Sequence, residues 1–247
     1  MAGQETHESI KDMGISLIPG KFLARNAKHV TDAKRGLVLG RQKLHLKGHR
    51  LVKLARQLKQ YGIEVAPEDL VQEDGFTEKF LSAIGYPKLE AMDFTASEGA
   101  EHIHDLNKKV PKKLEGKFDL IIDGGTTEHI FHIGTALENC HAMLKPGGVM
   151  MSFVAADGWF GHGFFQTGPD VPWRYWHHCL GYQVLEAGAQ ERRGKQEYFD
   201  IPDPSGQRRG GVRAFNGPTM LLYAVRKPLE PKPKTFPVQG HYVDYER

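Results

Sequence analysis

The sequence predicts a Rossmann-like α/β domain with a mainly parallel sheet, an antiparallel C-terminal strand and helices on both faces. Residues 118–123 (FDLIID) are an isoleucine-rich apolar run too short for a globular helix, which is typical of a buried parallel strand. Apolar residues recur at helical spacing over 130–144, and the KPGG stretch at 145–148 ends that helix. A second apolar run at 149–154 completes a strand–helix–strand unit, and ligands of such sheets bind at the carboxyl ends of the strands.

The composition is that of an ordinary globular domain. The 247 residues suffice for one α/β domain with a full core, and 40% hydrophobic and 26% charged residues are usual proportions. A formal charge of +3 with dispersed basic residues gives no reason to expect nucleic acid as a partner. No stretch reaches the ~18 apolar residues of a membrane helix, and the N-terminus has no signal-peptide core. We therefore expect a cytoplasmic protein with no membrane partner.

The other elements follow from similar patterns. Residues 35–40 predict the first core strand, and the amphipathic stretch 49–61 predicts a helix. The remaining expected elements are a short helix at 77–85, a strand at 88–94, a short strand within 101–107, a helix at 170–179 and strands at 182–187 and 219–226. The two cysteines, Cys140 and Cys179, are too far apart in sequence to form a metal motif or a disulfide framework.

The sequence predicts a main domain with a segment before it, a segment after it and an insertion within it. Residues 1–30 are predicted to be an N-terminal extension or cap, 31–226 the main domain, and 227–247 an extended proline-rich tail. About fifty residues separate the first strand from the next strand-end acid, where about twenty are usual in dinucleotide-binding domains. We therefore expect 63–86 to be an insertion and a candidate lid or homodimer contact.

One stretch resembles a known family. FDLIIDGGTTEHI, followed by a helix and LKPGGVMMSF, resembles the fourth and fifth motifs of class I S-adenosylmethionine (SAM)-dependent methyltransferases. The LKPGG turn is common across that superfamily, so it supports the fold and not a substrate. The GHGFFQ stretch from Gly161, with a later proline and a Tyr–Trp pair, resembles a bacterial subgroup associated with glycan and natural-product tailoring. A nucleotide-dependent oxidoreductase is disfavoured because no GxGxxG follows a predicted strand.

The resemblance implies SAM as the cofactor. Asp93 ends the second predicted strand, where a carboxylate can accept hydrogen bonds from both ribose hydroxyls; helix capping is the alternative. Asp105 corresponds to the acid near the adenine amine, and turn formation is its alternative. The neighbouring residues assigned to the same cofactor are Phe94, Leu106, Asp123 and Gly124.

The loop after the first strand departs from the superfamily pattern. Of the usual glycine cluster, Gly40 alone is in place within residues 40–48. In one interpretation, Arg41 or Gln42 contacts the methionine carboxylate of the cofactor, because a guanidinium can bind a carboxylate through two hydrogen bonds. In the other, the cofactor site has decayed and the fold serves as a noncatalytic binding protein or partner subunit. The acids retained at later strand ends favour the first interpretation.

Two histidines are the candidate catalytic residues. His129 follows the acid that ends the fourth strand, and a neutral imidazole can accept a proton from a hydroxyl or ammonium group. Capping of the next helix is the alternative role. His162 lies in the glycine- and aromatic-rich loop 155–169, which leaves the sheet on the same rim. No spacing of acids and histidines predicts a metal site. The expected acceptor is a small molecule or a sugar-like compound methylated on oxygen, with N-methylation as the alternative.

Overall fold

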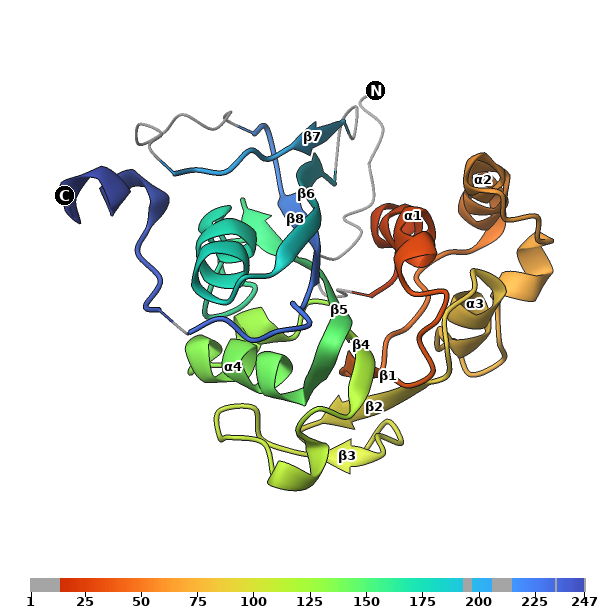
Figure 1. Cartoon of the computed structure of the whole chain (residues 1–247). Helices are drawn as coiled ribbons and strands as arrows, with labels where there is room; N and C mark the ends of the chain where they lie inside the picture. Colours follow the sequence, from red (N-terminus) through yellow and green to blue (C-terminus); the bar gives the residue numbers. More distant parts are fainter. Residues whose placement is uncertain (1–13, 193–196, 206–214, 234, 247) are drawn as a thin grey trace.

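The computed structural model describes residues 14–192, 197–205, 215–233 and 235–246 (Figure 1). Within these residues eight strands form one sheet in the order β3-β2-β1-β4-β5-β8-β6-β7. The strands are β1 (Gly36–Leu39), β2 (Leu89–Asp93), β3 (His102–Ile103), β4 (Phe118–Asp123), β5 (Leu144–Asp157), β6 (Gln183–Glu191), β7 (Tyr198–Asp200) and β8 (Thr219–Arg226). Strands β1 to β5 pair in parallel, whereas β8 and its neighbours pair antiparallel. The predicted mainly parallel sheet with an antiparallel C-terminal strand is confirmed.

The strand order reverses direction at β1. This strand lies between β2 and β4, so Gly36 pairs with Leu89 on one side and with Leu120 on the other. The ends of β1 and β4 are level, because Leu39 lies opposite Asp123. In open α/β sheets, ligands bind outside the carboxyl ends of the strands at such a reversal. The fold therefore predicts a binding site at the carboxyl ends of β1 and its two neighbours, β2 and β4.

Helices cover both faces of the sheet, with α1, α2 and α3 on one side and α4 and the π-helix η6 on the other (Figure 1). Side chains alternate along β1: Val38 belongs to the core beneath α1–α3, and Leu37 and Leu39 belong to the core beneath α4. Burial on both faces explains why the strands are continuous apolar runs. The α-helices are α1 (Leu17–Asn26), α2 (Gly48–Leu58), α3 (Glu78–Ala83) and α4 (Ile133–Met143), and η6 (Val171–Cys179) is a π-helix. The 3₁₀ turns are η1 (Ala27–His29), η2 (Lys59–Tyr61), η3 (Pro67–Leu70), η4 (Lys112–Leu114), η5 (Thr127–His129) and η7 (Gly240–Glu246).

The region around α4 differs in detail from the prediction. The helix starts at Ile133 rather than at residue 130, because the chain first forms the turn η5. It ends at Met143, one residue before the predicted end, and the KPGG stretch is part of β5, which begins at Leu144. Between the pairs Phe118–Leu144 and Leu120–Val149 the register shifts, which leaves the KPGG residues as extra length on β5.

The predicted insertion at 63–86 contributes to the main core. Leu70, Phe80 and Ile84 are buried in the same cluster as Phe22 of α1. The roles of this segment as a lid or dimer contact, and of residues 1–30 as a cap, stay predictions, and residues 1–13 lie outside the described ranges.

The proline-rich tail packs against η6. Arg174 Nε donates to the carbonyl of Val238 over 2.8 Å, and the Gly240 N–H donates to Asp170 Oδ1 over 2.7 Å.

Across the described ranges, no helix combines the length and apolar character needed to cross a bilayer. Both cysteines, Cys140 and Cys179, are buried free thiols.

Candidate functional site

A cavity of about 320 Å³ lies at the carboxyl ends of β1 and β2. It is the position that the reversal of strand order indicates. Its wall brings together five residues assigned to the cofactor and one candidate catalytic histidine: Gly40, Asp93, Phe94, Asp105, Leu106 and His129. These residues come from four separate loops or strand ends, so the fold, and not the sequence spacing, assembles them.

Gly40 allows the loop after β1 to approach its neighbours closely. Its φ is +67°, a conformation that side chains disfavour, and its N–H donates to the carbonyl of Met92 over 2.8 Å. A Cβ at this position would lie 3.3 Å from Thr126 Oγ1 and 3.9 Å from Asp93 Oδ2. The hydroxyl of Thr126 donates in turn to the carbonyl of Leu39 over 2.8 Å. The glycine therefore keeps this part of the cavity open.

The two acids of the cavity have different surroundings. Asp93 Oδ1 accepts the N–H of Thr95 over 3.1 Å, which leaves most of the acceptor sites of this carboxylate for other donors. Asp105 Oδ1 accepts the side-chain amide of Asn107 over 2.9 Å and the backbone N–H of the same residue over 3.0 Å. These hydrogen bonds, with the charge of Lys108, hold the pKa of Asp105 below its usual value. Asp105 thus forms the turn considered in the sequence analysis and also lines the cavity.

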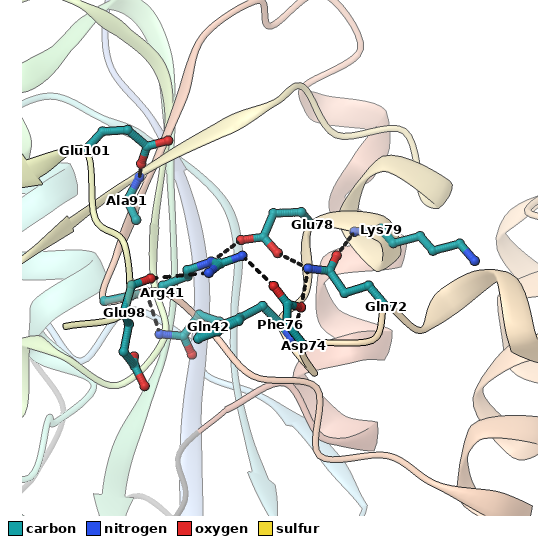
Figure 2. Close-up of polar contacts among 11 residues, drawn as sticks. Arg41, Gln42, Gln72, Asp74, Phe76, Glu78, Lys79, Ala91, Glu98 and Glu101 are labelled. Carbon is teal, nitrogen blue, oxygen red and sulfur yellow. Dashed lines mark hydrogen bonds and ion pairs between the residues drawn. The ribbon is translucent and has the colours of Figure 1, made fainter. Parts of the chain in front are cut away.

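Arg41 is not among the residues that line this cavity. Its guanidinium points instead toward two carboxylates of the segment 63–86 (Figure 2). Its Nε donates to Glu78 Oε1 over 2.6 Å, and its Nη2 donates to Asp74 Oδ2 over 3.0 Å. The guanidinium also lies over the ring of Phe76, 3.7 Å from its centroid. Two carboxylates of the segment 63–86 therefore make the ion pairs that the sequence assigned to the methionine carboxylate of the cofactor. The residue lines a different cavity of about 380 Å³.

Gln42 packs the loop after β1 onto the loop after β4. Its side chain is buried, and Nε2 donates to the carbonyls of Leu39 over 3.2 Å and Gly40 over 3.0 Å. Gly124 fits against it without a gap, since a Cβ there would lie 2.4 Å from Gln42 Oε1. Gln42 and Gly124 therefore hold together the loops after β1 and β4, and neither residue is among those that line the cavity.

Asp123 organises the turn that follows β4. It is fully buried, and its carboxylate accepts the N–H of Thr126 over 2.9 Å, the hydroxyl of Thr127 over 2.5 Å and the hydroxyl of Ser152 over 3.3 Å. Burial raises the pKa of Asp123, and these hydrogen bonds oppose the rise. Asp123 thus positions η5, the turn that carries His129.

A cluster of three titratable side chains lies beside the cavity, formed by Glu128, His129 and His162. The two imidazole rings are 4.9 Å apart between centroids, and His162 Nε2 lies 3.8 Å from Glu128 Oε1. Glu128 is fully buried, and the N–H of Ala155 donates to its Oε1 over 3.3 Å. Glu128 is not among the functional residues predicted from the sequence. The EH dipeptide was its one sequence signal, and helix capping explained that pair equally well.

Burial sets the protonation of this cluster. Burial, reinforced by the charge of Asp123, raises the pKa of Glu128 to about 8, so this carboxyl is mostly protonated near pH 7. Neighbouring groups partly desolvate the ring of His129, although the residue as a whole is exposed, and this desolvation lowers its pKa, with the charge of Asp123 opposing it. Burial lowers the pKa of His162 as well, helped by His129 and Arg192. Both imidazoles are therefore neutral near pH 7, the state in which a histidine accepts a proton.

Aromatic side chains surround the cluster on the rim of the sheet. The ring of Trp159 packs 4.9 Å from that of His162, and Phe131 packs 5.6 Å from Phe164. Phe131, Phe160 and Phe164 are all exposed despite their size. Exposed aromatics next to a cavity are a feature of binding surfaces.

No protein-family model matches the sequence, and no curated protein matches it. Solved structures of similar fold include a 1,6-didemethyltoxoflavin N1-methyltransferase from Burkholderia thailandensis with 1,6-didemethyltoxoflavin and S-adenosylhomocysteine bound. It is 14% identical, with 84% of this chain and 78% of that chain covered and a TM-score of 0.41. The N-methyltransferase NodS from Bradyrhizobium japonicum WM9, in complex with S-adenosylhomocysteine, is 13% identical, with 92% and 94% covered and a TM-score of 0.44.

At these identities the comparisons concern the fold alone, and the assignment of the fold rests on this chain's own strand order and pairing. The parallel order 3-2-1-4-5 is followed by the antiparallel insertion of β8 beside β5. The tailoring subgroup stays a prediction. By its strand order and pairing, the chain has a Rossmann-like α/β fold with antiparallel C-terminal strands, as its sequence predicted.

Proposed function

We propose that this chain is a SAM-dependent methyltransferase that methylates an oxygen atom of a glycan precursor or small metabolite. One observation carries the proposal: a cavity at the carboxyl ends of β1 and β2 has Gly40, Asp93 and Asp105 in its wall, with the neutral imidazole of His129 beside them. A methyl donor held by the acids in this wall would lie next to a group able to accept a proton.

In this proposal the cofactor is held by strand-end side chains. Asp93 accepts hydrogen bonds from the two ribose hydroxyls, for which its remaining acceptor sites suffice. Asp105 lies at the adenine edge and Leu106 against the ring, while Gly40 lets the backbone approach the ligand. Arg41 has no part in this arrangement, because its ion pairs with Asp74 and Glu78 hold it elsewhere.

Methyl transfer requires the protein mainly to position the methyl donor and the acceptor and to supply a base. A lone pair of the acceptor oxygen forms a bond to the methyl carbon as the carbon–sulfur bond breaks, and the bonding pair stays on sulfur to give S-adenosylhomocysteine. His129 takes the hydroxyl proton. Positioning supplies about 7–11 kcal/mol in favourable cases, and general-base assistance about 10²- to 10⁴-fold in rate.

The rim supports an acceptor with a ring or sugar-like body. Exposed Phe131 and Phe164 pack together beside the cluster, which gives such a body an apolar surface to stack on. N-methylation of the same acceptors is the alternative reaction.

A noncatalytic binding protein or partner subunit is a second candidate function. One observation favours it: Arg41, the residue best able to replace the lost glycine-rich loop in binding a carboxylate, is already paired with two acids. Calorimetric titration with SAM and S-adenosylhomocysteine tests the cofactor. If neither ligand binds at millimolar concentration, the proposal of a SAM-dependent enzyme is wrong. If SAM binds but labelled SAM methylates nothing across hydroxylated, amine and sugar-nucleotide pools, the noncatalytic function is supported.

Substitutions test the assignment of the base on an identified acceptor. We expect His129→Ala to reduce turnover about 10²- to 10⁴-fold with little change in SAM affinity. His162→Ala should act mainly on acceptor binding and raise KM. His132→Ala is the matched control, since this exposed histidine is three residues from His129 and outside the cluster. Parental turnover in both of the first two variants would mean that the histidines are structural and that catalysis proceeds by positioning.

A further inference from the structure

The cluster of Glu128, His129 and His162 contains two buried polar atoms without a hydrogen-bond partner among the described residues. These atoms are Glu128 Oε2 and His162 Nε2. Buried polar side-chain atoms in native proteins are nearly always paired, so two such atoms in one cluster require an explanation. Both belong to side chains whose potential ligand atoms gather in one place.

The geometry of the cluster fits a cation. One ligand atom each from Glu128, His129 and His162 lies within 4.8 Å of the other two, and His162 Nε2 is 3.8 Å from Glu128 Oε1. Ligands bound to a tetrahedral zinc ion at its usual bond lengths lie roughly 3.4 Å apart. Glu128 and His162 are therefore almost at the required separation. His129 is the exposed member of the three, so its ring has room to turn inward by the remaining ångström or so.

The donor set is also suited to a specific class of ion. Two imidazoles and one carboxylate are the protein ligands of catalytic zinc sites that keep a position open. The same three ligands on one face of a metal hold ferrous ions in oxygenases. The buried carboxylate of Asp123 adds negative potential, because its charge acts on both Glu128 and His129.

The surrounding backbone holds the three ligands together. The carbonyl of Glu128 accepts the N–H of Phe164 over 2.9 Å and that of Phe165 over 3.1 Å, which ties the loop after β5 to the turn after β4. Gly163 makes this approach possible, since a Cβ there would lie 2.9 Å from the carbonyl oxygen of Glu128 and 3.2 Å from His129 Nδ1. The two loops are thus fixed by main-chain contacts before any ion binds.

We propose that Glu128, His129 and His162 bind one divalent transition-metal ion such as zinc. One coordination position of the ion would be open towards the cavity that His129 lines. No metal site is predicted from the sequence. The three proposed ligands come from two loops far apart in sequence, so no motif of fixed spacing indicates them.

A metal at this position has a consequence for the reaction, which rests on the proposed function. The open position would take the acceptor hydroxyl, and a bound divalent ion lowers the pKa of a coordinated oxygen. The proton would then leave to water, and His129 would serve as a ligand and not as the base. Metal binding itself does not depend on this role.

Titration of the untagged, metal-depleted protein with Co²⁺ tests the site. Intense visible d–d absorption, well above the weak bands of the free aquo ion, reports a cobalt ion held by nitrogen and oxygen ligands in a low-coordinate site, as a stand-in for zinc. We expect one equivalent of such absorption in the parent and in His132→Ala. Loss of hydrogen-bond partners to metal ligands typically costs 10- to 100-fold in affinity, so loss of a ligand in Glu128→Gln, His129→Ala or His162→Ala should cost more than about 100-fold. Circular dichroism checks the fold, and exposed His129 is the substitution least disruptive to packing.

Each outcome is informative. The proposal is overturned if the parent at millimolar Co²⁺ shows only the weak absorption of the free aquo ion, or if correctly folded His129→Ala and His162→Ala bind cobalt as tightly as the parent. Calorimetry with SAM on the metal-depleted protein separates the two proposals. SAM binding without a metal site refutes this inference alone, and a metal site without SAM binding refutes the proposed function alone.

Discussion

Replacing Asp93 with alanine should weaken SAM binding by roughly 10- to 150-fold. Asp93 ends β2 in the cavity wall, and of its two carboxylate oxygens Oδ1 already accepts the N–H of Thr95. A hydrogen bond to a charged group contributes about 1.5–3 kcal/mol net, which corresponds to that range of affinity. Because the Thr95 contact is exposed, its loss should affect stability little.

Calorimetric titration with SAM measures the change. Asp93→Asn keeps the shape and one oxygen acceptor, so its affinity should fall between those of the parent and Asp93→Ala. Asp69→Ala is the control, since the side chain of Asp69 is 63% exposed on η3, outside the cavity wall. If Asp93→Ala binds SAM as tightly as the parent, Asp93 does not hold the ribose and the cofactor lies elsewhere.

Two further predictions concern the loops and the sheet. Gly124→Ala places a Cβ 2.4 Å from Gln42 Oε1, so we expect the free energy of unfolding to fall by about 1–3 kcal/mol. Thermal unfolding should show this as a lower Tm. An unchanged Tm would mean that the side chain of Gln42 moves aside without a loss of stability. The hydrogen bond from Arg35, with that from His102, holds the pKa of Glu90 down at about 2. A depressed carboxyl pKa stabilises the fold above the unfolded value near 4.5, and this contribution disappears as the pH falls towards 2. Glu90→Gln should therefore lower Tm at pH 7 and match the parent near pH 2, and an equal difference at both pH values would contradict this.

The strands were predictable because their signal is local. The runs at 118–123 and 219–226 are β4 and β8 with the bounds expected from the sequence, since strands buried on both faces must be apolar throughout. The strand expected within 101–107 is β3, which has two residues only. It pairs with β2 alone at the edge of the sheet, so little of its sequence has to be apolar.

The site was predictable where it depends on strand ends and not where it depends on loop packing. Asp93 and Asp105 follow strands, so parallel pairing was enough to bring them to one cavity. The partners of Arg41 lie in the segment 63–86, whose fold no short-range pattern determines. The burial of Glu128 similarly depends on the loop after β5, which reaches it from a distant part of the chain.

The attachment of that loop through main-chain atoms affects how the protein can diverge. The N–H groups of Phe164 and Phe165 reach the carbonyl of Glu128 whatever side chains these positions carry, except proline. Phe160 and Phe164 are exposed, so their replacement removes little packing. If the proposed function is correct, substitutions on the outer surface of this loop should change acceptor preference while the main-chain contacts keep Glu128 and His162 in place.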